Sequence, residues 1–223
     1  MPDKTDWTRE KLEEEINSHV AVTIPVNMQV ESQQRILDFT EADRILKEAD
    51  LIAVGECYCR KKYKKCDGPL EVCLNLDKEA QNFIERGLAR KIVLKEALEV
   101  LKRSHEAGLV HITYTFTEKP KPELICSCCS CCCHSMSALV RFGMAEAVVQ
   151  SEYVAENNPE TCISCGKCVE RCQFEARCLE DGSMRFDRAK CFGCGVCVTT
   201  CPTQSISLVR RASKDPEKEG VPD

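Results

Sequence analysis

Aromatic residues and long apolar runs are both scarce in this sequence of 223 residues. Phe, Trp and Tyr make up 5% of the chain, so aliphatic side chains and any bound groups must supply most of the interior. No stretch approaches the roughly 20 apolar residues that a membrane helix requires, and no apolar segment follows the first residues as in a secretory signal. We therefore expect a cytoplasmic protein that does not insert into membranes.

The chain also lacks a concentration of positive charge. Its net charge is −5, and residues 157–223 carry equal numbers of acidic and basic side chains, so the excess lies in residues 1–156. The element order expected over residues 78–117 loosely resembles a winged helix, but its longer helix mixes both signs of charge. Because nucleic-acid binding requires a concentrated basic face, we expect no nucleic-acid partner.

Several motifs of redox and nucleotide-binding enzymes are missing. There is no Gly-x-Gly-x-x-Gly and no P-loop, which disfavours nicotinamide, flavin or nucleotide binding through those motifs. There is no Cys-x3-Cys-x2-Cys, so a radical S-adenosylmethionine site is not supported. The haem attachment motif Cys-x2-Cys-His fails before His134, because position 130 is Ser. No acid–base pair is evident either, so no catalytic residue is assigned.

Cysteine, by contrast, is abundant, with 19 residues in the chain. In a reducing compartment such a density is more typical of metal ligands than of disulfides. The stretch from Cys126 to Cys133 crowds six thiols into eight positions, and disulfides between such close neighbours would be strained. We therefore expect most of the cysteines to bind metal.

Eight cysteines form two copies of one run near the C-terminus. Both copies have the spacing Cys-x2-Cys-x2-Cys-x3-Cys, from Cys162 to Cys172 and from Cys191 to Cys201, and Pro202 follows the second. This spacing is typical of paired cubane iron–sulfur clusters. A zinc ribbon would instead pair Cys-x2-Cys units across a longer gap.

On these runs, residues 160–209 resemble the bacterial two-cluster ferredoxins. The resemblance implies a pseudo-symmetric βαβ-βαβ fold with two [4Fe–4S] clusters, in which the fourth cysteine of each run ligates the other cluster. The implied ligand sets are Cys162, Cys165, Cys168 and Cys201 for cluster 1, and Cys191, Cys194, Cys197 and Cys172 for cluster 2.

Two positions depart from the ferredoxin pattern. Gln173 stands where the family usually has proline, which weakens a turn preference but removes no ligand. Cys178 stands where an aliphatic residue is usual. We interpret Cys178 as a small buried hydrophobic residue rather than as an extra ligand.

Ten further cysteines lie in the N-terminal part, in two groups separated by an ordered helix and strand. The first group is Cys57, Cys59, Cys66 and Cys73, and the second is Cys126, Cys128, Cys129, Cys131, Cys132 and Cys133. We predict that these ten candidate ligands hold at least one additional iron–sulfur cluster. A zinc site, or structural thiols that fill a core, are the alternatives. This part resembles a cysteine-rich domain that is fused to ferredoxin modules in anaerobes.

Basic residues interrupt the first of these cysteine groups. Arg60, Lys61, Lys62, Lys64 and Lys65 could dock an acidic partner. We favour the interpretation that these basic side chains balance the negative charge of a bound cluster, because a thiolate-ligated cubane is anionic.

The patterning predicts an α+β fold with three segments. Residues 1–156 form a mixed helix and strand domain, residues 157–209 form the ferredoxin-like domain after a linker at 156–159, and residues 210–223 form a disordered tail. Helices are predicted over 7–18, from Thr40, and over 78–86, 94–107 and 135–152, and strands over 20–30, 51–55, 109–117, 174–179 and 205–209.

These features indicate a polyferredoxin-like protein that passes low-potential electrons to or from a partner oxidoreductase. The N-terminal domain would extend the electron path or dock the partner protein. The alternative is an oxidoreductase subunit or enzyme whose N-terminal cysteine-rich site reduces a substrate such as a disulfide or a cofactor. Oxygen-sensitive clusters would suit an anaerobic organism.

Overall fold

The protein mixes helices and strands, which confirms the predicted α+β class. The computed structural model describes residues 6–16, 19–31, 34–116 and 121–211. Its helices are α1 (Arg9–Ile16), α2 (Thr40–Lys47), α3 (Tyr58–Tyr63), α4 (Asp77–Glu85), α5 (Leu94–Glu106), α6 (His134–Phe142), the short 3-10 helix η1 (Ala145–Ala147), α7 (Lys167–Glu170) and α8 (Val196–Thr200). Its strands are β1 (His19–Thr23), β2 (Asn27–Glu31), β3 (Gln34–Asp38), β4 (Ile52–Glu56), β5 (Glu71–Leu76), β6 (Ala89–Ile92), β7 (Val110–Phe116), β8 (Leu124–Cys128), β9 (Tyr153–Asn157), β10 (Arg177–Glu180), β11 (Ser183–Phe186) and β12 (Ile206–Arg210).

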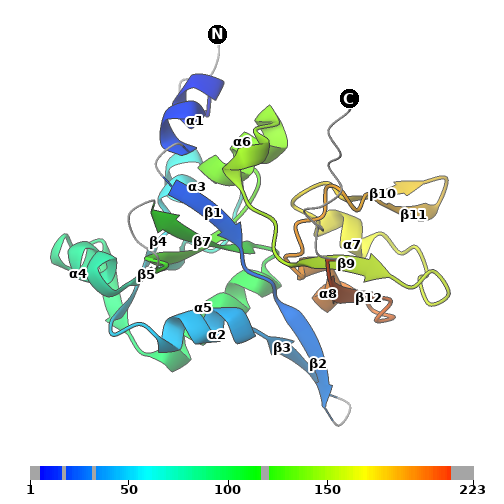
Figure 1. The fold of residues 1–223 in the computed structure, drawn as a ribbon, viewed down its shortest axis with the longest axis horizontal. Helices are drawn as coiled ribbons and strands as arrows, with labels where there is room; N and C mark the ends of the chain where they lie inside the picture. Colours follow the sequence, from blue (N-terminus) through cyan, green and yellow to red (C-terminus); the bar gives the residue numbers. More distant parts are fainter. Residues whose placement is uncertain (1–5, 17–18, 32–33, 117–120, 212–223) are drawn as a thin grey trace, which may run out of the picture.

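A six-stranded antiparallel sheet organises the N-terminal part (Figure 1). Its strand order is β1-β7-β8-β5-β4-β6. One face carries an aliphatic core, in which Leu46 of α2 and Leu101 of α5 pack against Ile125 and Leu74 of the sheet. The apolar periodicity of residues 94–107 predicted α5 because Ala97, Val100 and Leu101 recur on one side of the helix and are buried there.

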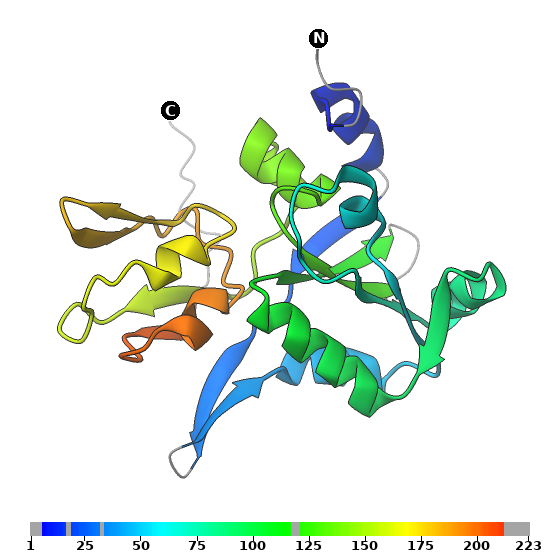
Figure 2. The same cartoon turned by 180° about the vertical axis from the view of Figure 1, so that it is seen from behind.

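The opposite face of the sheet carries the N-terminal cysteines. Side chains alternate along a strand, so Cys126 and Cys128 share one face of β8 while Ile125 points to the other. This second core is completed by Leu12 of α1, Tyr63 of α3 and the buried side chains Met136 and Ala138 of α6. Figures 1 and 2 show these three helices together on one side of the sheet. Two helix layers of different chemistry therefore cover one sheet.

The C-terminal part runs β9-α7-β10 and then β11-α8-β12 (Figure 2). Strand β9 pairs with β12, and β10 pairs with β11 through a tight turn at Asp181 and Gly182. Strand β9 covers the first two residues of the predicted linker, 156 and 157, and crosses the predicted boundary after residue 156. Its pairing with β12 places residues 153–157 structurally with the C-terminal part.

Several predicted elements differ from the structure. The helix predicted over 135–152 ends at Phe142, because Gly143 adopts a left-handed φ of 68° and stops it. The strand predicted over 20–30 is divided into β1 and β2 around Pro25, which cannot donate a ladder hydrogen bond. The winged-helix resemblance required two helices joined by a turn, but strand β6 lies between α4 and α5. The resemblance is therefore wrong.

Two further observations concern the ends of the chain and the membrane. Arg210, predicted as the start of the tail, is the last residue of β12, and residues 212–223 lie outside the described residues. None of the helices in the described part of the chain combines the length and apolar character that a membrane span requires.

Candidate metal centres

The four cysteines assigned to cluster 2 lie together in the interior of the C-terminal part. Cys172, Cys191, Cys194 and Cys197 line one small cavity. Two backbone N–H groups donate to their sulfurs: that of Ala176 to Cys172 Sγ at 3.3 Å, and that of Ala155 to Cys191 Sγ at 3.4 Å. Such bonds favour the thiolate form, which is the form that ligates metal.

Electrostatics also links these four thiols. Burial raises the pKa of Cys197 to about 12, and negative charge on Cys172 and Cys191 adds to the increase. Burial and negative charge on Cys197 and Cys172 likewise raise the pKa of Cys194. Four thiolates here would need a cationic group between them, and a bound metal would supply that charge.

The cysteines assigned to cluster 1 lie closer to the surface. Burial and negative charge on Cys162 and Cys165 raise the pKa of Cys168, which places these three thiols in one neighbourhood. Cys201 shares an apolar core with Cys168. Burial acts to raise the pKa of Cys201, but hydrogen bonds from Ser205 and Thr203 outweigh it and lower the pKa to about 7.

Sequence comparison identifies the chemistry of this region. Residues 184–207 match the family model described as a 4Fe-4S binding domain. The matched segment holds the whole second cysteine run, from Cys191 to Cys201. No curated protein matches the chain. The chain therefore contains a 4Fe-4S binding motif, and together with its other cysteine groups this indicates an iron–sulfur electron-transfer role.

The structure sorts the ten N-terminal cysteines differently from the sequence. The four-thiol group, as we call it, takes one member from the first sequence group and three from the second. Its members are Cys66, Cys129, Cys131 and Cys132. Their four Sγ atoms all lie within 4.8 Å of one another. Strand pairing between β5 and β8 and the turn after β8 bring these distant positions together.

The other six cysteines form a second set, the six-thiol group. Its members are Cys57, Cys59, Cys73, Cys126, Cys128 and Cys133. Cys73 Sγ on β5 lies 3.9 Å from Cys126 Sγ on the neighbouring β8. Interaction with Cys73, burial and negative charge on Cys128 raise the pKa of Cys57. Interaction with Cys128 and burial raise the pKa of Cys133. Burial and negative charge on Cys133 and Cys73 raise the pKa of Cys59, so this thiol also interacts with members of the six-thiol group.

A buried guanidinium lies against the four-thiol group. Arg60 is 1% exposed, and its Nη2 donates to Cys129 Sγ at 3.6 Å and to the Ser127 carbonyl at 3.1 Å. Burial acts to raise the pKa of Cys129, but the charge and hydrogen bond of Arg60 outweigh it and lower the pKa to about 7. Lys61 pairs with Glu56 at the surface. Arg60 therefore balances thiolate charge, as the sequence interpretation favoured, whereas Lys61 does not.

Two polar side chains, those of His134 and Tyr114, lie beside the six-thiol group. His134 Nδ1 lies 3.7 Å from Cys59 Sγ, and the Tyr114 hydroxyl lies 3.8 Å from Cys133 Sγ and 3.2 Å from Ser135 Oγ. No local pattern in the sequence identifies Tyr114 as part of the site. Its place on β7 beside β8 brings it there.

The end of the first cysteine run contacts the N-terminal cysteine face through Gln173. Its Oε1 accepts hydrogen bonds from the Ser130 N–H at 3.0 Å and the Ser130 hydroxyl at 2.9 Å, and its amide donates to the Gly108 carbonyl at 3.1 Å. Gln173 directly follows Cys172, and Ser130 lies in the turn after β8. The departure from the ferredoxin pattern therefore has a local reason, since proline has no side-chain amide.

Two more contacts hold the two parts together. Arg171 donates to the carbonyls of His105 and Glu106 at 2.7 Å each, at the end of α5. The Val26 N–H donates to the Cys194 carbonyl at 3.2 Å. Cys172 and Cys194, two of the cysteines assigned to cluster 2, therefore lie at the junction with the N-terminal part.

Cys178 differs from its interpretation as a buried hydrophobic residue. It is exposed on the β10–β11 hairpin, and its Sγ lies 3.6 Å from Glu180 Oε1. Strand alternation buries Arg177 and turns the next side chain outward. Among the described residues, the charged groups that act on its thiol are Glu180, Lys190 and Arg185.

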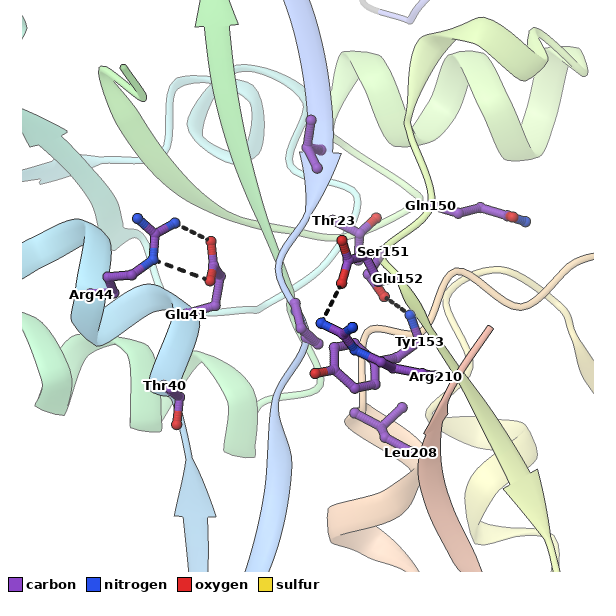
Figure 3. A pocket seen from close by; sticks show the side chains of 12 residues that line it. Thr23, Thr40, Glu41, Arg44, Gln150, Ser151, Glu152, Tyr153, Leu208 and Arg210 are labelled. Atoms are coloured by element: carbon purple, nitrogen blue, oxygen red, sulfur yellow. Dashed lines mark hydrogen bonds and ion pairs between the residues drawn. The ribbon is translucent and has the colours of Figure 1, made fainter. Parts of the chain in front are cut away.

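A polar cleft of about 500 Å³ lies away from the cysteines, between α2 and the β9–β12 pair (Figure 3). None of the described side chains that line it is a cysteine. Arg44 pairs with Glu41 at 2.7 Å, and Arg210 pairs with Glu152 at 3.0 Å. These charges satisfy one another, so the cleft offers no feature that competes with the cysteine groups as a functional site.

Proposed function

We propose that this protein carries electrons through two [4Fe–4S] clusters in its C-terminal part and at least one more iron–sulfur cluster in its N-terminal part. The observation that carries the proposal is the gathering of Cys172 with Cys191, Cys194 and Cys197 around one cavity. A cysteine from the first run joins three from the second, as crossed ligation in a pseudo-symmetric ferredoxin fold requires.

We assign the N-terminal cluster to the six-thiol group. A cubane needs four thiolates, and this group offers six from β5, β8 and the starts of α3 and α6. The sheet face around it is apolar, with Tyr63, Met136 and Val110 buried in the same core. A buried, apolar setting limits water access to a cluster and tunes its potential.

The arrangement suggests an order along the electron path. Cluster 2 would face the N-terminal sheet, because Gln173 and Val26 contact that part, and the stacked rings of Phe174 and Phe192, 4.4 Å apart, belong to the same core as the N-terminal cysteines. Cluster 1 would face solvent, because Cys165 is exposed and Ile163 beside it is 64% exposed. We infer that a redox partner protein or oxidoreductase complex docks at the cluster 1 end.

Iron and sulfide quantification of the full chain, purified without oxygen, tests this proposal. Two cubanes contain eight irons, and a third raises the count to about twelve per chain. The variant Cys73→Ser, in the six-thiol group, should lower the iron count by about four and remove one of the EPR signals of the reduced protein. Cys178→Ser is the matched control and should leave both unchanged. A count of eight irons in the unaltered protein would contradict the N-terminal cluster.

One observation favours the alternative function, in which the N-terminal site reduces a substrate. The six-thiol group has two thiols more than a cubane requires, and Cys59 lies beside a histidine, His134. A disulfide or cofactor substrate would then meet a free thiol next to a proton donor. An enzyme of this kind should lose turnover but keep all its iron in the variant Cys59→Ser. A pure electron carrier should show no such selective loss.

A further inference from the structure

We propose that the four-thiol group binds a single zinc ion in a tetrahedral site that is separate from every iron–sulfur cluster. The site consists of Cys66, Cys129, Cys131 and Cys132. This inference goes beyond electron transfer, because zinc has no redox chemistry.

The sulfur positions fit one ion. Zinc–thiolate bonds of about 2.3 Å in a regular tetrahedron place neighbouring sulfurs about 3.8 Å apart. The Sγ atoms of Cys66 and Cys129 are 3.7 Å apart, those of Cys131 and Cys132 are 3.8 Å apart, and all four lie within 4.8 Å of one another. A cubane separates its thiolates more widely, because each binds a different iron corner.

The cysteine runs of the C-terminal part provide an internal comparison. We compared sets of at least three His, Cys, Asp or Glu residues whose ligand atoms all lie within 4.8 Å of one another. Among the described residues, the four-thiol group is the one set that meets this criterion. The eight cysteines of the ferredoxin-like runs, where cubanes are expected, do not meet this criterion. The four-thiol group therefore has the dimensions of a mononuclear site, and the cubane runs do not.

Charge at the site also suits zinc. Four thiolates and one Zn²⁺ leave a net charge of −2, and the buried guanidinium of Arg60 lies 3.6 Å from Cys129 Sγ. Gly68 packs close to the same guanidinium, where a Cβ would lie 3.2 Å from Arg60 Nε. Buried metal sites of this closed, four-cysteine type are structural.

The position of the site indicates what the zinc would do. It would tie Cys66, just after α3, to the turn after β8 that carries the other three ligands. The same turn carries Ser130, which receives Gln173 from the ferredoxin-like part. Trp7 of the N-terminal segment also donates to the Cys132 carbonyl at 3.0 Å. Zinc would therefore fix the surface on which the ferredoxin-like part docks.

Metal analysis of the full chain, purified without oxygen from cells supplied with both iron and zinc, tests the proposal. We expect one zinc per chain, with an X-ray absorption spectrum that reports four sulfurs at about 2.3 Å. Cys131→Ser should lose that zinc and keep the iron, whereas Cys73→Ser should keep the zinc and lose iron. Cys165→Ser, in the cluster 1 run, should also keep the zinc.

A measurement on the unaltered sequence covers the case in which Cys131→Ser does not fold. Cobalt supplied in place of zinc should give the intense absorption of one tetrahedral cobalt–tetrathiolate centre per chain. A chain without zinc or cobalt at this stoichiometry, or a Cys131→Ser variant that loses iron and sulfide, would overturn the proposal. Because iron and zinc are counted separately, an iron count of eight would contradict the N-terminal cluster and leave the zinc site standing.

Discussion

At the scale of single residues, Arg60 is the clearest case of a charged side chain that serves the cysteine groups. It follows Cys59 on α3, and its guanidinium reaches the Pro69 carbonyl at 2.6 Å as well as Ser127 and Cys129. A buried charge of this kind is stable only when it is paired and hydrogen-bonded. Arg60 therefore both depends on the thiolates and stabilises them.

Arg60→Met should destabilise the metal-loaded protein by about 3 kcal/mol, because it leaves two buried carbonyls and a thiolate without their donor. The urea midpoint of the loaded protein measures this change. Arg60→Lys should retain part of the stability, since it keeps the charge but not the planar fork. Lys61→Met is the matched control, and its exposed side chain predicts a change within about 0.5 kcal/mol. Equal losses in the two methionine variants would contradict the role of Arg60.

Cys178 should behave as a free surface thiol. Iodoacetamide should modify it in the folded, metal-loaded protein, because its thiol is exposed. Mass spectrometry of the modified chain checks this. Cys178→Ser should remove the adduct, keep the iron content and change stability by about 0.5 kcal/mol or less. A drop in iron content would instead identify Cys178 as a ligand.

At the scale of elements, the contact between α8 and the segment before β2 depends on a glycine. Gly195, at the N-cap of α8, has a φ of +80°, and a Cβ there would lie 1.6 Å from the Val26 carbonyl oxygen. No side chain fits in that space. The approach brings the backbone of the N-terminal part directly onto the loop between Cys194 and Cys197.

Gly195→Ala should therefore destabilise the protein by about 4 kcal/mol or more, because the clash is with backbone and cannot relax cheaply. Loss of iron from the cluster 2 site should accompany it. Gly182→Ala is the control: its φ is similar, +73°, but no described atom lies within 4 Å of the new Cβ, so the cost should be about 1 kcal/mol. The loss of thermal stability should be measured for both variants. The difference between the two losses gives the cost of the clash, because both variants share the strain of a positive φ.

Element boundaries were predicted well where local signals are strong. Helix α5 has a clear apolar period and ends before Gly108, whose φ is +81°. The helix after Cys133 was predicted ten residues too long, because the apolar residues of 145–149 continue the helical pattern although Gly143 ends the helix. In that segment Val149 bonds to β1 instead, with its N–H donating to the Ala21 carbonyl at 2.7 Å.

At the scale of the whole molecule, residues around Cys172 join the C-terminal part to the turn after β8 and the end of α5. Gln173 contacts Ser130, Arg171 contacts the end of α5, and Val26 contacts Cys194. The hydrogen bonds of Gln173 link the backbone next to Cys172 to the turn that carries three cysteines of the four-thiol group. These hydrogen bonds therefore fix the position of Cys172 relative to the four-thiol group.

Gln173→Ala should loosen this docking, because it removes two hydrogen bonds to Ser130 and one to Gly108. The expected cost is about 2 kcal/mol. Hydrogen exchange of the Ser130 amide, which donates to Gln173, should accelerate about tenfold or more. Gln81→Ala on the exposed face of α4 is the control and should leave that amide unchanged. An unaltered Ser130 exchange rate in Gln173→Ala would contradict the docking role.

The sequence alone indicated iron–sulfur chemistry, because the cysteines of a cluster-binding motif follow one another at a spacing that the chain records directly. The two runs from Cys162 and Cys191 and the excess of N-terminal cysteines pointed to iron–sulfur binding before any fold was known. Likewise the α+β class followed from local apolar periodicity. Both are properties of neighbouring residues.

Only the tertiary structure decided how the N-terminal cysteines divide. In sequence they form a group of four and a group of six, but the groups in space exchange members, so that Cys66 joins Cys129 and leaves Cys73 to pair with Cys126. Strand pairing and the turn after β8 set those neighbours, and strand alternation exposes Cys178. These relations depend on which strands adjoin and which faces are covered, and such long-range pairing leaves no mark in local spacing.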